Sequence, residues 1–228
     1  DILSELVHNK VYRISVSLLL LTNCAITFVA VHLKYYIEYV LEMKEASINI
    51  MAFLFITAIL FVPLWVYAAN KYGKDLSYRV AMSCYAVIIL SMALVSPSNI
   101  YMVYAFAIAA GVFHAAALTL PWAIVPDVVE CDELEKGTRR EGLFYGGTTF
   151  SYKLATALPI FISGLGLSFF GYVANQAQSE TAILGIKILV GVAPALFFLL
   201  GAFISRYYPL TKEKHEEVLI ELARRQSS

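Results

Sequence analysis

Long apolar runs separated by short polar breaks dominate the pattern of this chain. Six runs are long enough to cross a bilayer, because a helix needs about 20 mostly apolar residues to span roughly 30 Å of hydrocarbon. The breaks contain turn formers and charges, which would be costly in lipid. The pattern predicts an all-α membrane protein with six transmembrane helices, at residues 12–39, 48–69, 76–96, 100–126, 142–173 and 181–207.

Composition agrees with this class of protein. Of the 228 residues, 60% are hydrophobic and only 15% are charged, whereas about a quarter are charged in soluble domains. The formal net charge is zero, which gives no sign of a nucleic-acid partner. The three cysteines stand singly in the sequence, so neither a zinc site nor a disulfide framework is predicted.

Lysine and arginine are distributed unequally between the two sides of the predicted bundle. Counted by alternate breaks, thirteen of the 17 fall on the side of both termini, and only Lys34 and Lys44 fall on the other side. By the positive-inside rule both termini are cytoplasmic. We divide the chain into a cytoplasmic linker (1–11), a six-helix bundle (12–208) and a cytoplasmic amphipathic tail (209–228). Since the chain begins without Met or a signal peptide, we expect a part of a longer protein.

One lysine, Lys153, is predicted to lie near the middle of the bilayer. Eleven residues from Gly142 advance a helix by about 16 Å, which is too deep for easy snorkelling. Tyr145, Thr149 and Thr156 share its polar stripe. We expect the stripe to line a path for substrate or cation, with packing of Lys153 against backbone carbonyls as the alternative.

The first span carries a second polar stripe. Asn23, Thr27, Lys34 and Glu38 fall within about 60° on a helical wheel. Asn23 lies near the predicted midplane, and Lys34 and Glu38 lie near the outer end, where they can pair at i,i+4 spacing. We interpret this pair as an outer gate or, equally well, as an interfacial ion pair.

The fourth span contains His114 and the Pro121-Trp122 turn. His114 and Trp122 are further candidates for the path, although a lone histidine among alanines is more often a packed, hydrogen-bonded residue. Catalysis would need a positioned acid, base or nucleophile, and no Ser-His-Asp set, HExxH motif or paired deep carboxylate occurs in the sequence. We therefore do not expect an enzyme.

The order of motifs after the fourth span resembles one transporter family. Pro-Trp is followed by Asp-Val-Val-Glu-x-Asp-Glu, then by Gly-x-Arg-Arg-Glu-Gly-Leu-Phe-Tyr-Gly, then by the midspan lysine. This order resembles the melibiose permease-like glycoside-pentoside-hexuronide:cation symporters of the major facilitator superfamily. The resemblance covers essentially the whole chain and implies the second six-helix half of a twelve-helix fold.

The resemblance implies a cation-coupled symporter of a sugar or glycoside in a bacterial inner membrane, working by alternating access. It also implies a partner, the absent N-terminal six-helix half, which would bind most of the coupling Na⁺ or H⁺; no other cofactor is expected. Lys153 would lie near the substrate and cation site. The residues that match the family's cytoplasmic charge network, which would pair across to the other half when the inner gate closes, are Asp127, Glu130, Glu133, Arg140 and Glu141. The alternative for the charged run 127–141 is a solvated cytoplasmic turn.

Two other functions remain open. The animal lysophosphatidylcholine symporters share the LPWxxxPDVV pattern and the midspan lysine but lack the Arg-Arg-Glu-Gly sequence, which favours the bacterial branch for this chain. A lysophospholipid:cation symporter is thus the alternative of the same class. A non-transporting membrane module that binds a partner through its tail is the alternative of a different class.

Overall fold

The computed structural model describes residues 6, 8–94 and 99–226, and the described part contains helices and turns but no strand. Six helical segments within it are long and apolar enough to cross a membrane. The prediction of an all-α protein with six spans is confirmed. The six spans are Lys10–Val40, Lys44–Tyr72, Lys74–Leu94, Ile100–Lys136, Glu141–Phe169 and Glu180–Tyr207.

Several spans are built from more than one type of helix. The first consists of α2 (Lys10–Tyr35) and a π-helical turn, η1 (Tyr36–Val40). The second consists of a 3₁₀ turn, η2 (Lys44–Ala46), and α3 (Ser47–Tyr72). The next three are α4 (Lys74–Leu94), α5 (Ile100–Lys136) and α6 (Glu141–Phe169). The sixth runs through α7 (Glu180–Lys187), the π-helical η3 (Ile188–Val192), α8 (Ala193–Ile204) and the 3₁₀ turn η4 (Ser205–Tyr207).

Capping side chains and glycines set the ends of these helices. The Asn99 side chain accepts a 2.9 Å hydrogen bond from the Tyr101 amide and so satisfies one of the unpaired amides at the start of α5. Gly137 ends the same helix in the left-handed conformation, with φ of 72°. Gly73 alone separates α3 from α4, with φ of 93°. These are conformations that a residue with a side chain adopts only at a cost.

The fourth span is longer than the sequence predicted. We expected it to end at residue 126 and the charged run 127–141 to form a turn, but α5 continues to Lys136 and the turn comprises only residues 137–140. At 1.5 Å per residue, the helix extends for about 55 Å, far beyond the hydrocarbon layer. Hydropathy marks where a helix leaves lipid, and it carries no information on whether the helix continues in water.

The other predicted boundaries agree to within a few residues. The largest remaining differences are four residues: the second span begins at Lys44 where we predicted residue 48, and the fifth ends at Phe169 where we predicted residue 173. Gly171, with φ of 75°, lies in the turn that follows. The end of the predicted span 76–96 and part of the predicted linker 1–11 lie outside the described residues.

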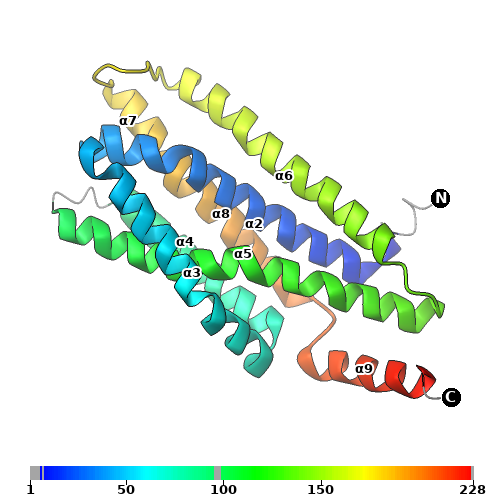
Figure 1. The fold of residues 1–228 in the computed structure, drawn as a ribbon. Helices are drawn as coiled ribbons and strands as arrows, with labels where there is room; N and C mark the ends of the chain where they lie inside the picture. Colours follow the sequence, from blue (N-terminus) through cyan, green and yellow to red (C-terminus); the bar gives the residue numbers. More distant parts are fainter. Residues whose placement is uncertain (1–5, 7, 95–98, 227–228) are drawn as a thin grey trace.

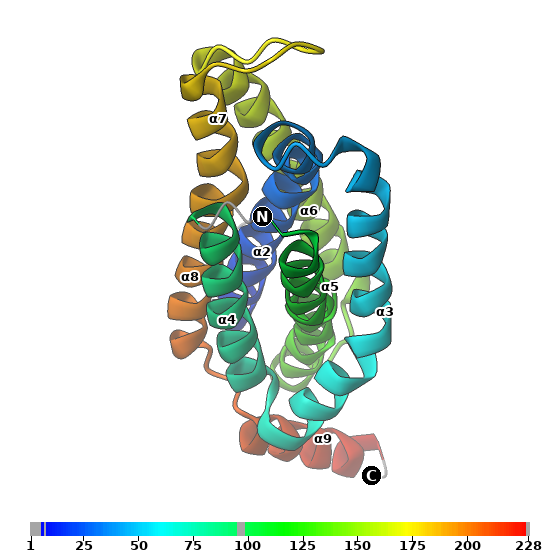
Figure 2. The ribbon, with the colours of Figure 1, turned by 90° about the vertical axis from the view of Figure 1, so that its left-hand side faces the viewer.

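The helices form one bundle in which α2 has neighbours on several sides. α2 packs against α5, α6 and α8, and α4 packs against α3, α5 and α8 (Figures 1 and 2). The start of α2 and the turn between α5 and α6 lie toward the same end of the bundle (Figure 1). A further helix, α9 (Lys212–Gln226), lies across that end (Figure 2).

Two spans, α3 and α6, leave most of their surface uncovered. In their most apolar windows 28% and 22% of the residues are buried, against 44% to 50% in the other four spans. Their exposed side chains are large and apolar, as at Ile59 and Phe161. These faces are suited to lipid or to another apolar helical surface.

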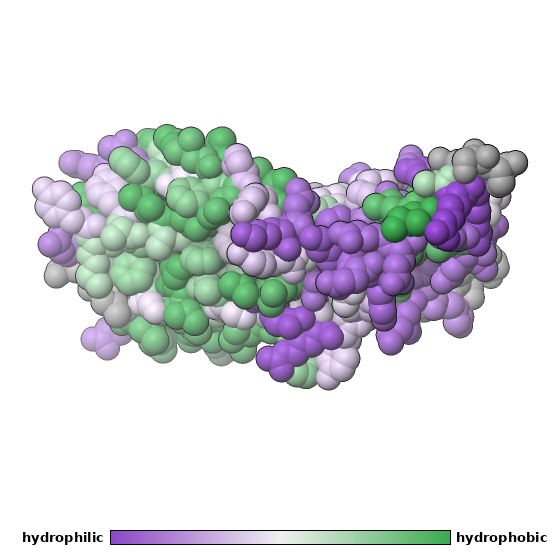
Figure 3. Space-filling view, turned by 90° about the horizontal axis from the view of Figure 1, so that it is seen from below, coloured by the Kyte–Doolittle hydropathy of each residue, from purple (hydrophilic) through white to green (hydrophobic). Residues whose placement is uncertain are grey.

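Polar residues gather at the end where α9 lies. Seen from below, the hydrophilic surface covers the α9 end of the molecule, and the rest of that face is largely hydrophobic (Figure 3). This separation is typical of a bundle embedded in lipid with one end at the polar boundary.

Candidate functional site

The two predicted polar stripes meet at the contact between α2 and α6. Asn23 Nδ2 donates to Thr156 Oγ1 at 2.7 Å and to the Tyr152 carbonyl at 3.3 Å. Thr156 in turn donates to the Tyr152 carbonyl at 3.0 Å. Hydrogen bonds of this kind join helices whose surroundings are apolar. The structure therefore brings Asn23 and Thr156, one from each stripe, into direct contact.

A small cavity of about 50 Å³ lies beside this contact, between α2, α5 and α6. The Trp122 and Tyr152 rings line it, with centroids 5.5 Å apart. The other lining residues, most of them apolar, are Leu19, Thr22, Asn23, Ile26, Ala117, Leu118 and Pro121. The cavity thus combines apolar walls with an amide at its edge, as ligand sites do, but it is far smaller than the roughly 300–1,000 Å³ of a ligand pocket and can form only part of one.

Tyr145, Thr149 and Lys153 lie on the same helix but do not line this cavity. All three side chains are exposed in the six-helix bundle. On a helical wheel Lys153 lies about 60° from Thr156, on the side away from the buried residues Phe144 and Ala155. Lys153 is therefore at the outer edge of the α2–α6 contact, and its role at a substrate or cation site stays a prediction.

Thr27 and His114 occupy different surroundings. Thr27 Oγ1 donates to the Asn23 carbonyl at 2.8 Å, so its hydroxyl is bonded within α2. His114 is 3% exposed, and its Nδ1 lies 2.9 Å from the Tyr85 hydroxyl of α4. The Phe55 ring of α3 packs edge-on against the imidazole. His114 is thus in the core between α3, α4 and α5, in the packed arrangement that the sequence left open as the alternative to a path residue.

The predicted outer pair is present at the opposite end of the bundle from α9. Lys34 Nζ lies 3.7 Å from Glu38 Oε1, with the lysine side chain 62% exposed. A pair this exposed contributes about 0–1 kcal/mol. Tyr35, Tyr39 and Tyr172 pack against one another beside it, with ring centroids 5.1 to 6.4 Å apart. An outer gate at this pair stays a prediction.

Charged side chains at the other end of the bundle pair within the chain. We call residues 127–136 the charged end of α5. Lys74, at the start of α4, donates to Asp127 Oδ1 at 2.6 Å and to the Ala123 carbonyl at 2.7 Å. The Asp127 side chain is 5% exposed, and an isolated charge would be costly there. Sequence reasoning did not select Lys74; its place directly after the glycine of the α3–α4 turn was the available signal.

A second set of ion pairs surrounds the turn at residues 137–140. Arg140 makes two parallel hydrogen bonds to Asp132, at 2.7 and 2.9 Å, and the Asp132 side chain is only 3% exposed. Arg139 pairs with Glu141 at 2.6 Å and with Glu133 at 2.9 Å. Hydrogen bonds to Glu141 and Glu133 raise the pKa of the Arg139 guanidinium above its ordinary value. Sequence reasoning selected neither Asp132 nor Arg139 as a gate residue.

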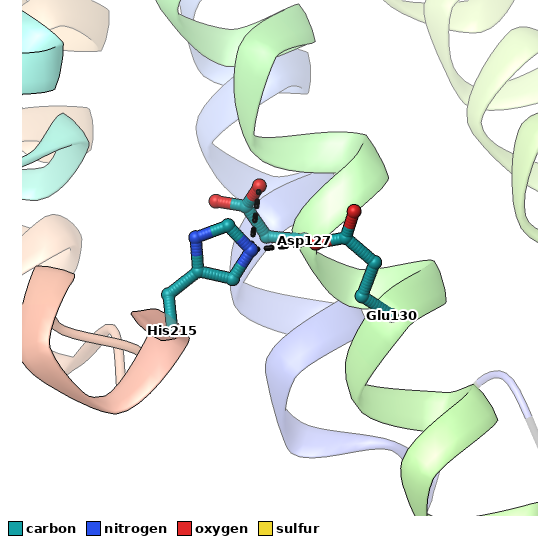
Figure 4. Close-up of side chains that lie close together, drawn as sticks. All are labelled: Asp127, Glu130 and His215. Carbon is teal, nitrogen blue, oxygen red and sulfur yellow. Dashed lines mark hydrogen bonds and ion pairs between the residues drawn. The ribbon is translucent and has the colours of Figure 1, made fainter. Parts of the chain in front are cut away.

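Helix α9 brings a histidine to the charged end of α5. His215 Nε2 lies 2.6 Å from Glu130 Oε2 and 3.5 Å from Asp127 Oδ1 (Figure 4). All five predicted gate residues therefore have an ion-pair or hydrogen-bond partner inside this chain, and pairing with another half of the protein stays a prediction.

The same three side chains offer one ligand atom each within 4.8 Å of one another, and a histidine with two carboxylates is a suitable donor set for a divalent metal. However, the Lys74 ammonium already contacts Asp127 Oδ1 and would repel a dication held by that oxygen. The contacts among Asp127, Glu130 and His215 are hydrogen bonds and ion pairs, and the arrangement of the three side chains suits these contacts better than it suits a metal ion.

Comparison with known proteins places the chain in a family. The family described as MFS/sugar transport protein matches residues 1–212. The chain belongs to this family. MFS/sugar transport proteins are multi-pass membrane proteins, in agreement with the six apolar spans.

Several relatives carry names that describe transport. The sphingosine-1-phosphate transporter MFSD2B of Xenopus tropicalis is 30% identical over 210 residues, which are 91% of this chain and 40% of that protein. The sodium-dependent lysophosphatidylcholine symporter 1-A of Danio rerio is 31% identical over 200 residues, covering 86% of this chain and 37% of that protein. An uncharacterized symporter of Synechocystis is 29% identical over 227 residues, covering 96% of this chain and 42% of that protein. The chain spans about two fifths of the length of these relatives.

Proposed function

We propose that this chain is the C-terminal six-helix half of a cation-coupled symporter for a lysophospholipid, working by alternating access. The order of motifs supports the C-terminal placement, and the length of the relatives leaves room for a second half. The names of the relatives support a single-chain lipid with a phosphate group as substrate. This proposal gives the lysophospholipid precedence over the sugar that the motif resemblance implied.

The names of the relatives carry the substrate class in this proposal, and the lining of the cavity between α2, α5 and α6 agrees with it. Its walls are mostly apolar, which suits part of an acyl chain, and two of the polar side chains in its lining, Thr22 and Asn23, already have hydrogen-bond partners. Asn23 donates to Thr156, and Thr22 lies 2.7 Å from the Tyr78 hydroxyl. A sugar carries many hydroxyl groups that need hydrogen-bond partners, and a site that leaves those hydroxyls unpaired binds the sugar poorly. The Lys153 ammonium, exposed on the neighbouring face of α6, would bind the phosphate.

A sugar or glycoside is the second candidate. The family description includes sugar transport. The Arg139-Arg140-Glu141-Gly142 sequence and the paired Trp122 and Tyr152 rings also favour it, because an aromatic face packs well against a sugar ring. The same paired rings can pack against an acyl chain, so substrate assays have to discriminate between the two.

The second half of the protein is the partner that this proposal requires. The uncovered apolar faces of α3 and α6 are suitable for packing against another helical bundle. Apart from Glu38 near one end, the predicted spans contain no Asp or Glu, so carboxylates of the other half would bind the coupling Na⁺ or H⁺. We further propose that both termini are cytoplasmic, from the excess of lysine and arginine on their side, in a bacterial inner membrane.

Uptake by the full-length transporter in reconstituted vesicles tests the proposal. Labelled lysophosphatidylcholine presented on albumin should accumulate when a Na⁺ or H⁺ gradient is imposed, and accumulation should stop when both gradients are collapsed. Labelled glycosides serve as the matched substrates. Gradient-driven uptake of a glycoside without uptake of the lysophospholipid would show that the sugar reading is right. Equal uptake with and without gradients would refute cation coupling.

A further inference from the structure

Helix α9 is attached to α5 at both of its ends. Near its start, His215 contacts Glu130. Near its end, Arg225 donates to the Leu134 carbonyl at 2.8 Å. Between these contacts, the Val218 side chain packs against the buried core. Both polar contacts fall on the charged end of α5, so α9 lies along that segment and restrains it.

Two prolines precede the segment that α9 restrains. Pro121 and Pro126 lie inside α5, and each lacks the amide that would bond to the carbonyl four residues earlier. A helix bends most easily where such bonds are missing. The charged end therefore follows the most easily bent part of α5, and a contact that fixes its position also fixes the bend.

The charges around His215 balance only when the imidazole is protonated. Asp127 and Glu130 contribute two negative charges and Lys74 one positive charge, so a neutral imidazole leaves the group at −1 and an imidazolium brings it to zero. A neutral imidazole carries no charge and has a single N–H to donate. The imidazolium carries a positive charge, which attracts both of the carboxylates that Nε2 faces. The charged groups that face His215 from α4, α5 and α9 are Lys74, Asp127, Glu130, Lys212 and Glu216.

Two further features let the ring respond to its surroundings. Lys212 and Glu216 pair with each other at 3.8 Å, so neither one offsets the carboxylates of α5. A hollow of about 240 Å³ lies between α9 and the α3–α4 turn, with Lys74, Asp127 and His215 in its lining. Water can reach the imidazole through this hollow, and histidine is the side chain that ordinarily changes charge between about pH 5 and 8.

We propose that α9 is a pH-sensitive latch in which protonated His215 holds Asp127 and Glu130 and thereby fixes the charged end of α5 against the α3–α4 turn. Loss of the proton weakens the contact and frees the segment beyond Pro126 to move. Any effect of the latch on transport rests on the proposed function, but docking of α9 does not, and the experiment measures docking alone. Protonation of Asp127 or Glu130 would weaken the contact in acid, so the sign of the response identifies the group that titrates.

Distances between two spin labels report the docking directly. The labels are attached through Leu76→Cys in α4 and Ala223→Cys in α9, both at exposed positions. The full-length transporter is placed in lipid nanodiscs, in a background without its native cysteines. We expect the ratio of docked to undocked α9 to be roughly tenfold higher at pH 5.5 than at pH 8, because a hydrogen bond to a charged group is the stronger kind.

Three variants separate the latch from general effects on α9. His215→Ala should shift α9 toward the undocked distances at both pH values, and His215→Lys, with its permanent charge, should keep it docked at both. Lys214→Gln removes a positive charge from the adjacent exposed position and should retain the response of the wild type.

Four results would overturn the proposal. The first is a distance distribution in His215→Ala that matches the wild type at both pH values. The second is a wild type that does not change between pH 5.5 and pH 8, and the third is a wild type in which α9 is less docked at pH 5.5 than at pH 8. The fourth is a response of the wild type that disappears on addition of EDTA, which would assign Asp127, Glu130 and His215 to a metal ion instead.

Discussion

Lys74 and Asp127 join the start of α4 to the charged end of α5 through an ion pair of 2.6 Å between residues 53 positions apart. The two partners are not equivalent, because the Asp127 side chain is 5% exposed and that of Lys74 is 25% exposed. The Lys74 side chain can turn toward water if its partner is removed, whereas the Asp127 carboxylate would remain buried. This asymmetry gives the pair a specific mutational signature.

Lys74→Met should lower the free energy of unfolding by about 2–3 kcal/mol, because it leaves the Asp127 carboxylate buried without its ammonium. Asp127→Asn should cost less, about 1 kcal/mol, since the freed lysine can be solvated. The double variant should recover most of the loss seen in Lys74→Met. Unfolding in mixed micelles, followed by circular dichroism, measures all three. Additive losses in the double variant would show that the pair does not act as a unit.

Adjacent arginines at the turn 137–140 should differ in their contribution to stability. Arg140→Gln removes two hydrogen bonds from the buried Asp132 carboxylate and should cost about 2 kcal/mol. Arg139→Gln removes pairs in which the arginine side chain is 50% exposed and should cost less than about 1 kcal/mol. When the same unfolding assay is repeated in 1 M salt, only the cost of Arg139→Gln should become smaller, because salt screens exposed ion pairs more than buried ones. Equal costs for the two variants would contradict the difference in burial.

Gly111 of α5 packs directly against α3, and it should not accept a side chain. An added Cβ would be 2.5 Å from the Leu54 carbonyl oxygen and 2.7 Å from Thr57 Cβ, so the helices would have to separate. Gly111→Ala should therefore destabilise by about 1–3 kcal/mol. Gly164→Ala is the matched control, because a Cβ there meets no described atom within 4 Å, and it should stabilise α6 by up to about 1 kcal/mol. A neutral Gly111→Ala would show that the two helices can move apart at little cost.

Lys153→Ala in the full-length transporter should lower lysophospholipid uptake about tenfold or more, because it removes the cation proposed to bind the phosphate. Lys153→Arg should restore little, since a planar guanidinium does not replace a compact ammonium. Leu154→Ala, at the adjacent exposed position, serves as the control and should transport normally. Uptake per molecule is compared at equal expression. Wild-type uptake by Lys153→Ala would leave this lysine with a packing role only.

Much of this protein could be predicted from the sequence because membrane insertion is encoded locally. In lipid, the backbone polar groups of each span must form their hydrogen bonds within that span, and a single helix provides them. About 20 consecutive apolar residues are therefore sufficient to locate a span. The pairing of Lys34 with Glu38 was also predictable, since the two residues are one helical turn apart. The motif order after the fourth span indicated a transporter of the major facilitator superfamily, and the match to MFS/sugar transport proteins agrees with it.

The partners of the polar residues were decided only by the tertiary structure. The sequence placed Asn23 and Thr156 on separate stripes, and the crossing of α2 with α6 joins them. It offered His114 as a path residue, and the packing of α3 and α4 against α5 places it beside Tyr85 in the core. It offered the tail only as a partner-binding segment in one alternative, and the fold brings His215 of that tail to Glu130. Apolar length determines that a helix crosses the membrane, but which of its faces meets which neighbour depends on how the whole bundle packs, and no local pattern records that.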